Sequence, residues 1–184
     1  MIDFGEPWAQ GKILTWLNDI IKDSKFPFES AEQEVVIKTR QGDRRPDIVI
    51  WYKKPDKIAC IIELKQPVVD VYNEDIVLAT LEKAVLVGVP FFAIWNLNKF
   101  VLWETFKPEV SLLDRRLLHW DILNIKRVQE LEKYEDTVRK FLHEFLSALA
   151  KYYEEKVIKI RELTIPRIYE VQVIPKPYPD EILV

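Results

Sequence analysis

Hydrophobic positions along the chain follow two spacings, one typical of strands and one typical of helices. Two runs of β-branched and aromatic residues, Ile48–Tyr52 and Ile58–Ile62, flank a short polar break with a proline, which predicts a β-hairpin with a longer loop. The second run is apolar without interruption, as in a central strand that is buried on both faces. A second hairpin is predicted from Val89–Trp95 and Phe100–Trp103, which an asparagine-rich turn connects.

Apolar residues spaced three and four apart predict three helices around these strands. The first begins at Gly5-Glu6-Pro7, where the proline suits the first helical position and the carboxylate suits the positive end of the helix dipole. The second spans Asn73–Val87, with Asn73 as its N-cap and Gly88 as its end. The third covers Lys126–Lys156. A strand at Val35–Thr39 is expected to precede the first hairpin, whereas residues 112–125 have a mixed pattern.

The third helix has a heptad-like seam, because it carries apolar residues seven positions apart. Two alternatives are open: the helix packs on its own domain, or it forms a dimer seam or a connector to a following domain. We divide the chain into a core at residues 1–108 and a helical extension with an extended tail at residues 109–184. This extension either connects to another domain or packs on the core. The seam residues are Leu131, Val138, Phe145 and Tyr152.

Composition predicts a soluble protein with one sizeable core. The 184 residues are 48% hydrophobic, and the longest apolar run, Ala84–Trp95, is too short to span a bilayer. The N-terminus lacks the pattern of a signal peptide, and the one cysteine, Cys60, lies in a strand expected to be buried. We expect a cytoplasmic protein without disulfides. The net charge of −3 argues against indiscriminate binding of nucleic acid.

Three charged residues are expected to meet at one end of the first hairpin. Asp47 opens its first strand, and Glu63 and Lys65 close the second on one face, about 6–7 Å apart. One interpretation is a solvated cross-strand ion-pair group worth at most about 1 kcal/mol. The other is a metal site, because two carboxylates suit a hard divalent cation such as Mg²⁺. The position at the rim of a core favours the metal site.

The same residues resemble the signature of a known nuclease family. Pro46-Asp47, followed on the next strand by Glu63-x-Lys65, resembles the motif of the PD-(D/E)XK nuclease superfamily, and most closely the N-terminal nuclease domains of type I restriction enzyme R subunits. The similarity covers roughly Gly5 to Thr105. It implies an α/β, restriction-endonuclease-like fold with a mixed central β-sheet flanked by helices, here followed by a long C-terminal helix. The sequence departs from the pattern in lacking a Gln and Tyr pair on the helix after the lysine strand.

The resemblance implies an Mg²⁺-dependent endonuclease acting on DNA, with Mn²⁺ as a substitute metal. Asp47, Glu63 and the backbone carbonyl of Leu64 would hold the metal. Lys65, which is expected to stay charged beside two carboxylates, would position water and stabilise the developing negative charge. A glutamate from the first helix often completes such sites, and here Glu6 and Glu34 are competing candidates. Gln66, directly after the lysine, is a further candidate that would face DNA or water.

Basic residues near the proposed site form a candidate surface for the DNA backbone. Because the chain has no phosphate-cradling Gly-Lys-Ser/Thr loop, ATP-driven work would belong to another domain or subunit. Possible partners besides DNA are therefore a motor, methyltransferase or specificity domain or subunit, or a second copy of the chain; no membrane is expected. The alternative function is a catalytically inactive nuclease-fold module for DNA binding or protein assembly. The candidate DNA contacts are Lys38, Arg40, Arg44 and Arg45.

Overall fold

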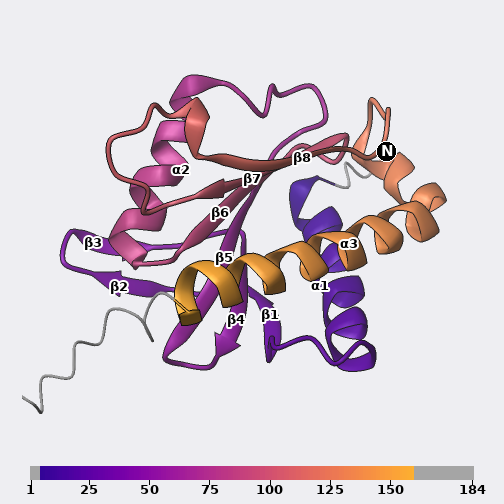
Figure 1. Ribbon diagram of the computed structural model, residues 1–184. Helices are drawn as coiled ribbons and strands as arrows, with labels where there is room; N and C mark the ends of the chain where they lie inside the picture. The colour runs from indigo at the N-terminus through magenta and orange to yellow at the C-terminus, as the bar shows by residue number, and fades with distance from the viewer. Residues whose placement is uncertain (1–4, 160–184) are drawn as a thin grey trace, which may run out of the picture.

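A six-stranded sheet lies between helices on both of its faces in the computed structural model, which describes residues 5–159 (Figure 1). A separate two-stranded hairpin projects beside it. The elements in chain order are α1 (Glu6–Asp23), β1 (Ser30–Gln33), β2 (Ile37–Thr39), β3 (Gly42–Arg44), β4 (Ile48–Lys53), β5 (Lys57–Leu64), α2 (Glu74–Val87), β6 (Phe91–Trp95), β7 (Lys99–Glu104), the 3-10 helix η1 (Leu113–Arg115), β8 (Arg116–Asp121), the 3-10 helix η2 (Val128–Tyr134), α3 (Glu135–Tyr153) and the π-helix η3 (Glu154–Ile158).

The strand order of the sheet is β1-β4-β5-β6-β7-β8. Only β5 and β6 run parallel, and every other neighbouring pair is antiparallel. A parallel pair needs a crossover connection, which α2 supplies between these two strands. The sheet is therefore mixed, as predicted, and its two central strands lie on either side of the crossover.

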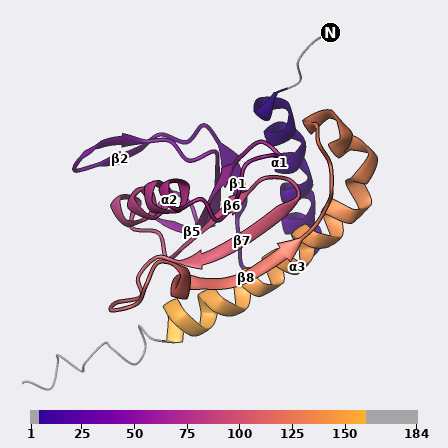
Figure 2. The same cartoon turned by 90° about the horizontal axis from the view of Figure 1, so that it is seen from above.

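Helices α1 and α3 cover one face of the sheet, and α2 covers the other (Figure 2). Successive side chains of β5 alternate between these layers. Cys60, Ile62 and Leu64 belong to the hydrophobic cluster under α1 and α3, whereas Ile61 packs on the α2 side. Burial raises the pKa of the Cys60 thiol far above its usual range, and the thiol is free and inert in the core, as expected. By the same alternation Glu63 points toward α2.

The ends of α1 and α2 match their predicted signals. Proline lies at the start of α1, and the side chain of Asn73 accepts a hydrogen bond from the backbone amide of Ile76 at 3.3 Å, which caps α2. Gly88 ends α2 with a left-handed φ of 78°, a conformation that glycine adopts without strain. No helix within residues 5–159 has the length and apolar character needed to cross a membrane.

The strand expected at Val35–Thr39 is present but shorter. Residues 37–39 form β2, which pairs only with β3, and the strand beside β4 is β1, which the sequence did not predict. Only Ala31 of β1 is buried, so this edge strand lacks the apolar pattern of a core strand. The side chain of Asn18 in α1 holds it, because its amide accepts from the backbone of Ala31 and donates back to it, both at 2.9 Å.

The sheet also extends past residue 108, because β8 pairs with β7 at the opposite edge. The mixed pattern of residues 112–125 gave no prediction of this strand, whose side chains are only half-buried. Beyond it, α3 packs on the same core as α1. The alternative of a helix packed on the core therefore describes α3, while the domain boundary at residue 108 stays a prediction. The expected tail, Thr164–Val184, lies outside the described residues.

The heptad-like seam of the third helix is largely buried within the chain. Leu131, Val138 and Phe145 have no exposed surface, and the ring of Phe145 lies 4.6 Å from that of Phe100 in β7. Dimerisation through this seam would require these side chains to leave the core. A homodimer thus stays a prediction without support from these positions.

Candidate active site

The register of β4 and β5 brings two carboxylates together at one end of the sheet. Ile48 pairs with Ile62, so Asp47, one residue before, lies opposite Glu63, one residue after. The backbone amide of Leu64 donates a hydrogen bond to Oδ2 of Asp47 at 2.7 Å, which ties the first carboxylate to the neighbouring strand. The antiparallel ladder therefore fixes the relative position of the pair.

Glu63 is a buried carboxylate between two ammonium groups. It is 6% exposed; its Oε1 pairs with Nζ of Lys83, and its Oε2 lies 3.6 Å from Nζ of Lys65. Burial and then repulsion from Asp47 raise the pKa of Glu63, against the opposing effect of Lys83 and Lys65. Its charged form therefore needs positive charge beside it, which lysines or a metal ion can provide.

Lys83 is a residue of this site that the sequence reasoning missed. It lies on α2, two turns after Asp75 and one after Ala79, on the helix face above Glu63. Its ammonium group also donates to the backbone carbonyl of Arg45 at 3.4 Å. The signal in the sequence is weak, because Lys83 follows Ile76 and Ala79 at helical spacing, but a lysine on a predicted helix is usually a solvated surface residue.

An open cleft of about 260 Å³ lies beside Glu63, between the end of β5 and α2. Charged groups of both signs line it together with small and apolar side chains. A phosphate group with bound water could enter such a space, because the cleft is open on one side and carries two ammonium groups. The lining residues are Glu63, Lys65, Asp75, Ile76, Ala79, Thr80 and Lys83.

The other face of the sheet supports Asp47 through Gln10 of α1. The side-chain amide of Gln10 donates a hydrogen bond to the backbone carbonyl of Asp47. Gln10 lies one helical turn after Glu6, which begins α1 but whose side chain is outside the described part of the structure. Glu34 is exposed and has a left-handed φ of 57°, after the end of β1. The choice between Glu6 and Glu34 stays open.

Leu64 and Gln66 are the remaining residues predicted for the site. Gln66 is exposed, and its backbone carbonyl accepts from the amide of Val69 at 3.0 Å in the turn after β5. The backbone amide of Leu64 contacts Asp47, whereas the role of its carbonyl as a metal ligand stays a prediction.

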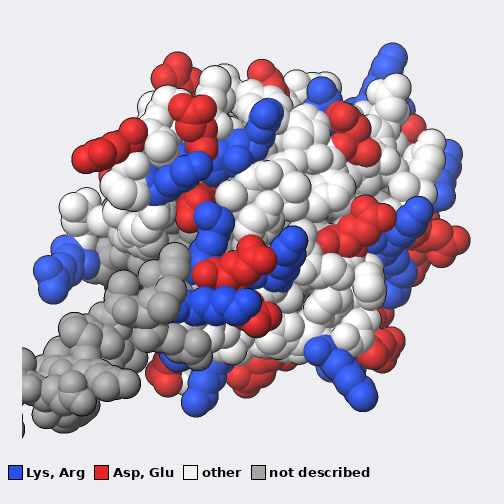
Figure 3. Space-filling model, in the orientation of Figure 1, with Lys and Arg blue, Asp and Glu red and all other residues white. Residues whose placement is uncertain are grey.

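The four candidate DNA contacts follow the hairpin of β2 and β3 and the segment after it. Lys38, Arg40 and Arg45 are exposed, while the guanidinium of Arg44 donates to the carbonyls of the hairpin turn. Figure 3 shows lysine and arginine interspersed with acidic side chains on the face that it displays, so this face has no continuous basic surface. A phosphate contact on this face would therefore depend on a few local side chains.

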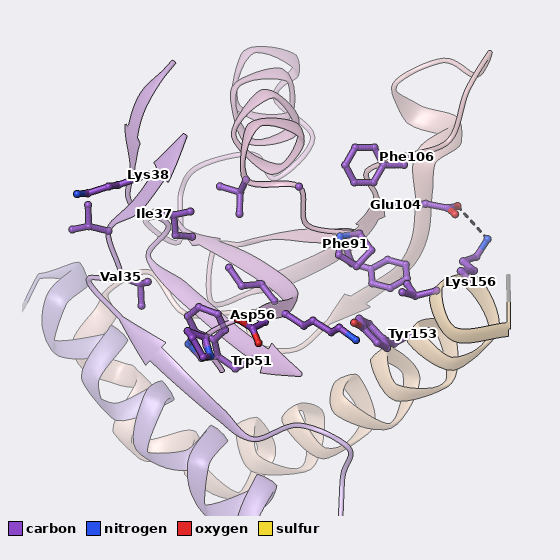
Figure 4. A pocket seen from close by; sticks show the side chains of 18 residues that line it. Val35, Ile37, Lys38, Trp51, Asp56, Phe91, Glu104, Phe106, Tyr153 and Lys156 are labelled. Atoms are coloured by element: carbon purple, nitrogen blue, oxygen red, sulfur yellow. Dashed lines mark hydrogen bonds and ion pairs between the residues drawn. The ribbon is translucent and has the colours of Figure 1, made fainter. Parts of the chain in front are cut away.

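A larger pocket than this cleft, about 610 Å³, lies at the opposite end of β4 and β5 (Figure 4). Figure 4 shows Trp51, Phe91 and Tyr153 around it, and Glu104 joined to Lys156 by an ion pair of 3.2 Å. The carboxylates in its lining are Asp56 and Glu104, and Glu104 is already paired with Lys156. The smaller cleft beside Glu63 is thus the better candidate for chemistry.

The site fits a metal that takes few protein ligands. Among the described residues, no group of three or more histidine, cysteine, aspartate or glutamate side chains could hold a metal ion. The carboxylates of Asp47 and Glu63 are hard oxygen donors, and Mg²⁺ is commonly held by one or two carboxylates together with waters and phosphate oxygens. The raised pKa of Glu63 beside Asp47 is consistent with a cation site, since a divalent cation would relieve the repulsion between the two carboxylates.

Comparisons with known proteins identify the fold. No protein-family model and no curated protein matches the sequence. The type IIG restriction endonuclease BpuSI aligns over 77% of this chain and 16% of its own length, with 12% identity and a TM-score of 0.61. A proposed nuclease of the DUF820 group from Anabaena variabilis aligns over 75% of this chain and 79% of its own, with 12% identity and a TM-score of 0.44. DrdV, in a complex with DNA, aligns over 74% of this chain and 14% of its own length, with 14% identity and a TM-score of 0.35.

The likeness to BpuSI confirms that the chain has a restriction-endonuclease-like fold, the fold class expected from the sequence. The other two TM-scores are too low to bear on the fold. The chain spans 16% of the length of BpuSI, so the match concerns one part of that enzyme.

Proposed function

We propose that the chain is an Mg²⁺-dependent endonuclease that hydrolyses DNA phosphodiester bonds, and that it is the nuclease domain of a restriction-modification type system. One observation carries the proposal: Asp47, Glu63 and Lys65 meet at one end of β4 and β5, within a restriction-endonuclease-like fold. Mn²⁺ is expected to substitute for Mg²⁺, because both accept hard oxygen ligands.

The metal would be held by the carboxylates of Asp47 and Glu63 and by the backbone carbonyl of Leu64. When bound, Mg²⁺ supplies Lewis acidity that polarises a phosphoryl oxygen and lowers the pKa of a bound water. The protein contributes the geometry: β4 and β5 hold the carboxylates at a fixed separation, and the hydrogen bond from Leu64 directs Oδ2 of Asp47. Its remaining oxygen, Oδ1, is then the one that would face the metal.

Lys65 would position the attacking water and stabilise the charge that develops on the phosphate. Its ammonium group lies 3.6 Å from Oε2 of Glu63, its side chain is 29% exposed, and it lines the open cleft. A fixed positive charge at such a place is worth more in the transition state than in the ground state, because negative charge accumulates there. DNA would be the main partner.

A motor, methyltransferase or specificity function would come from other domains or subunits. The sequence contains no phosphate-cradling Gly-Lys-Ser/Thr loop, and BpuSI extends far beyond the part that aligns with this chain; both observations support this proposal. The proposal for this chain is therefore limited to the cutting of the DNA backbone.

The test is incubation of the protein with supercoiled, linear and branched DNA in Mg²⁺, in Mn²⁺ and in EDTA. Cleavage in either metal and none in EDTA is expected. Asp47→Asn is the matched control, because it keeps the shape of the side chain but removes its charge; it should not cut. DNA that is bound in EDTA but uncut in both metals would favour the inactive nuclease-fold module instead.

A further inference from the structure

The ion pair of Lys83 with Glu63 occupies a carboxylate oxygen that the proposed metal would use. The Glu63 side chain is 8% exposed and that of Lys83 is 21% exposed, so water screens this contact poorly. Lys83 comes from α2, a different layer from the strands that carry the carboxylates. Its ion pair connects this helix to the carboxylate pair.

We infer that Lys83 is the resident cation of the carboxylate pair in the metal-free protein, and that a divalent metal binds in competition with the Lys83–Glu63 ion pair. The inference rests on the proposed function, since it concerns the same metal site. It goes beyond that proposal, because it assigns the setting of metal affinity to a second lysine that lies outside the Asp47, Glu63 and Lys65 motif.

Competition follows from the number of cations that one buried carboxylate can hold. Both oxygens of Glu63 already face an ammonium group, Oε1 that of Lys83 and Oε2 that of Lys65. A Mg²⁺ ion binds a carboxylate oxygen at about 2.0–2.1 Å, so it would stand next to at least one positive charge. Repulsion between the two cations then weakens metal binding, or the lysine moves away.

We expect Lys83 to move away from Glu63 when a metal binds. Its ammonium group has a second hydrogen-bond acceptor nearby and open space to move into. Its ammonium group is within 3.4 Å of the carbonyl of Arg45, two residues before Asp47, and its side chain lines the cleft. Lys65 lies farther from Glu63, at 3.6 Å, beyond the range of a hydrogen bond. The stronger contact of Lys83 is therefore the one that metal binding must break.

The experiment compares Mg²⁺ binding to wild type and to Lys83→Met by calorimetry without DNA. Methionine keeps much of the stem volume but no charge. The dissociation constant for Mg²⁺ should fall by about tenfold, as expected when a positive charge beside a partly exposed site is removed. In EDTA the variant should unfold at a lower temperature than wild type, because Glu63 loses its partner. Mg²⁺ should raise its unfolding temperature more than that of wild type.

Two controls separate charge from packing. Lys83→Arg keeps the positive charge, so its Mg²⁺ affinity should stay near that of wild type. Lys156→Met removes a half-buried ion pair of 3.2 Å to Glu104 at the other end of the sheet, and should leave Mg²⁺ affinity unchanged. If Lys83→Met does not fold, Lys83→Gln, which retains a hydrogen-bond donor without charge, takes its place with the same expectation.

Equal or weaker Mg²⁺ binding by the uncharged variant, with wild type binding normally, overturns the competition and leaves the proposed nuclease intact. Absence of Mg²⁺ binding in wild type and variant alike overturns both. The two failures are thus distinguishable in one set of titrations.

Discussion

The carboxylate of Asp47 accepts a hydrogen bond of 2.7 Å from the backbone amide of Leu64, on the neighbouring strand. This contact fixes the Asp47 carboxylate to the end of β5 as well as to its own strand. Asp47 therefore has two roles. One oxygen accepts a hydrogen bond that stabilises the fold, and the negative charge would bind the proposed metal. The two roles respond differently to substitution.

Asp47→Asn and Asp47→Ala should therefore differ in stability but agree in chemistry. Both should lose cleavage and bind Mg²⁺ more weakly, since neither carries the charge. The asparagine oxygen can still accept from Leu64, whereas alanine leaves that amide unpaired at a cost of about 1–3 kcal/mol in the free energy of unfolding. Calorimetry and urea unfolding measure the two effects. Wild-type cleavage by either variant would contradict the nuclease proposal.

The stability of the metal-free protein should fall with rising pH because of Glu63. Burial and the charge of Asp47 raise the pKa of Glu63 from its ordinary value of 4.5, so the folded protein holds this proton more tightly than the unfolded chain. The resulting stabilisation is complete below about pH 4.5 and is lost as pH rises through the folded pKa. Glu63→Gln cannot ionise and should lack this component.

Urea unfolding of both proteins with chelator, at several pH values upward from about 4.5, measures this difference. The variant should gain stability relative to wild type as pH increases. A difference that stays constant with pH would show that the Glu63 carboxyl titrates normally in the folded protein.

Lys65→Ala should lower the single-turnover cleavage rate by about 10²–10³, the size typical of losing one preorganised electrostatic group. Mg²⁺ affinity should stay level or tighten, because a cation leaves the neighbourhood of the metal. Lys65→Met keeps the stem volume, so equal losses in both variants with unchanged thermal unfolding would assign the effect to the ammonium group. Normal cleavage by Lys65→Ala would contradict this role.

Phe145→Asp should destabilise the protein rather than dissociate a dimer. Phe145 is fully buried between Phe100 and Phe141, so the substitution removes an aromatic contact and places a charge in the core. The loss should exceed the roughly 3–5 kcal/mol typical of a buried phenylalanine truncated to alanine. Ser147→Asp, on the exposed face of the same helix, is the control and should unfold like wild type. A folded monomer from a dimeric wild type would instead support the seam.

Arg40→Ala and Arg45→Ala test the proposed DNA surface, because both side chains are exposed. If each arginine contacts one phosphate, each variant should weaken binding similarly for all sequences and reduce the salt dependence of the affinity by a slope of about one. Lys12→Ala, which loses an exposed ion pair with Glu132, serves as the control. Fluorescence anisotropy over a range of salt concentrations gives the slopes. An unchanged salt dependence in both variants would show that DNA does not contact Arg40 or Arg45.

The sequence was most informative where one local pattern decides the structure. The continuous apolar run Ile58–Ile62 and the cap and stop signals of α2 predicted elements that the structure contains, and the antiparallel hairpin brought Asp47 near Glu63 as expected. Strand β1 escaped prediction because backbone pairing with β4 and the contacts of Asn18 from α1 hold it, whereas its own side chains have no apolar pattern. Such a contact has no local signature.

Lys83 escaped prediction for a related reason. Its place beside Glu63 depends on how α2 packs on the sheet, and a lysine on a predicted helix is usually a solvated surface residue. Gln10 is similar, because it reaches Asp47 from α1 across the other face of the sheet. The two carboxylates come from adjacent strands, so the register of the hairpin was enough to pair them. Their neighbours Gln10 and Lys83 come from helices on opposite faces of the sheet, whose packing the sequence does not give.

The single parallel strand pair has a consequence for the order of folding. The hairpin that joins Asp47 to Leu64 begins at the pair Lys53 and Lys57, only 4 residues apart (57 − 53). Lys83 arrives only when α2 folds back over β5 and β6 pairs with it, and the first such pair, Cys60 with Phe91, is 31 residues apart (91 − 60). Hairpins form from local contacts within microseconds, and crossovers close later because their contacts span more of the chain. The two carboxylates are thus expected to meet before their helical lysine docks. Early folding then brings like charges together in water, and the end of the hairpin becomes buried only once the crossover has closed.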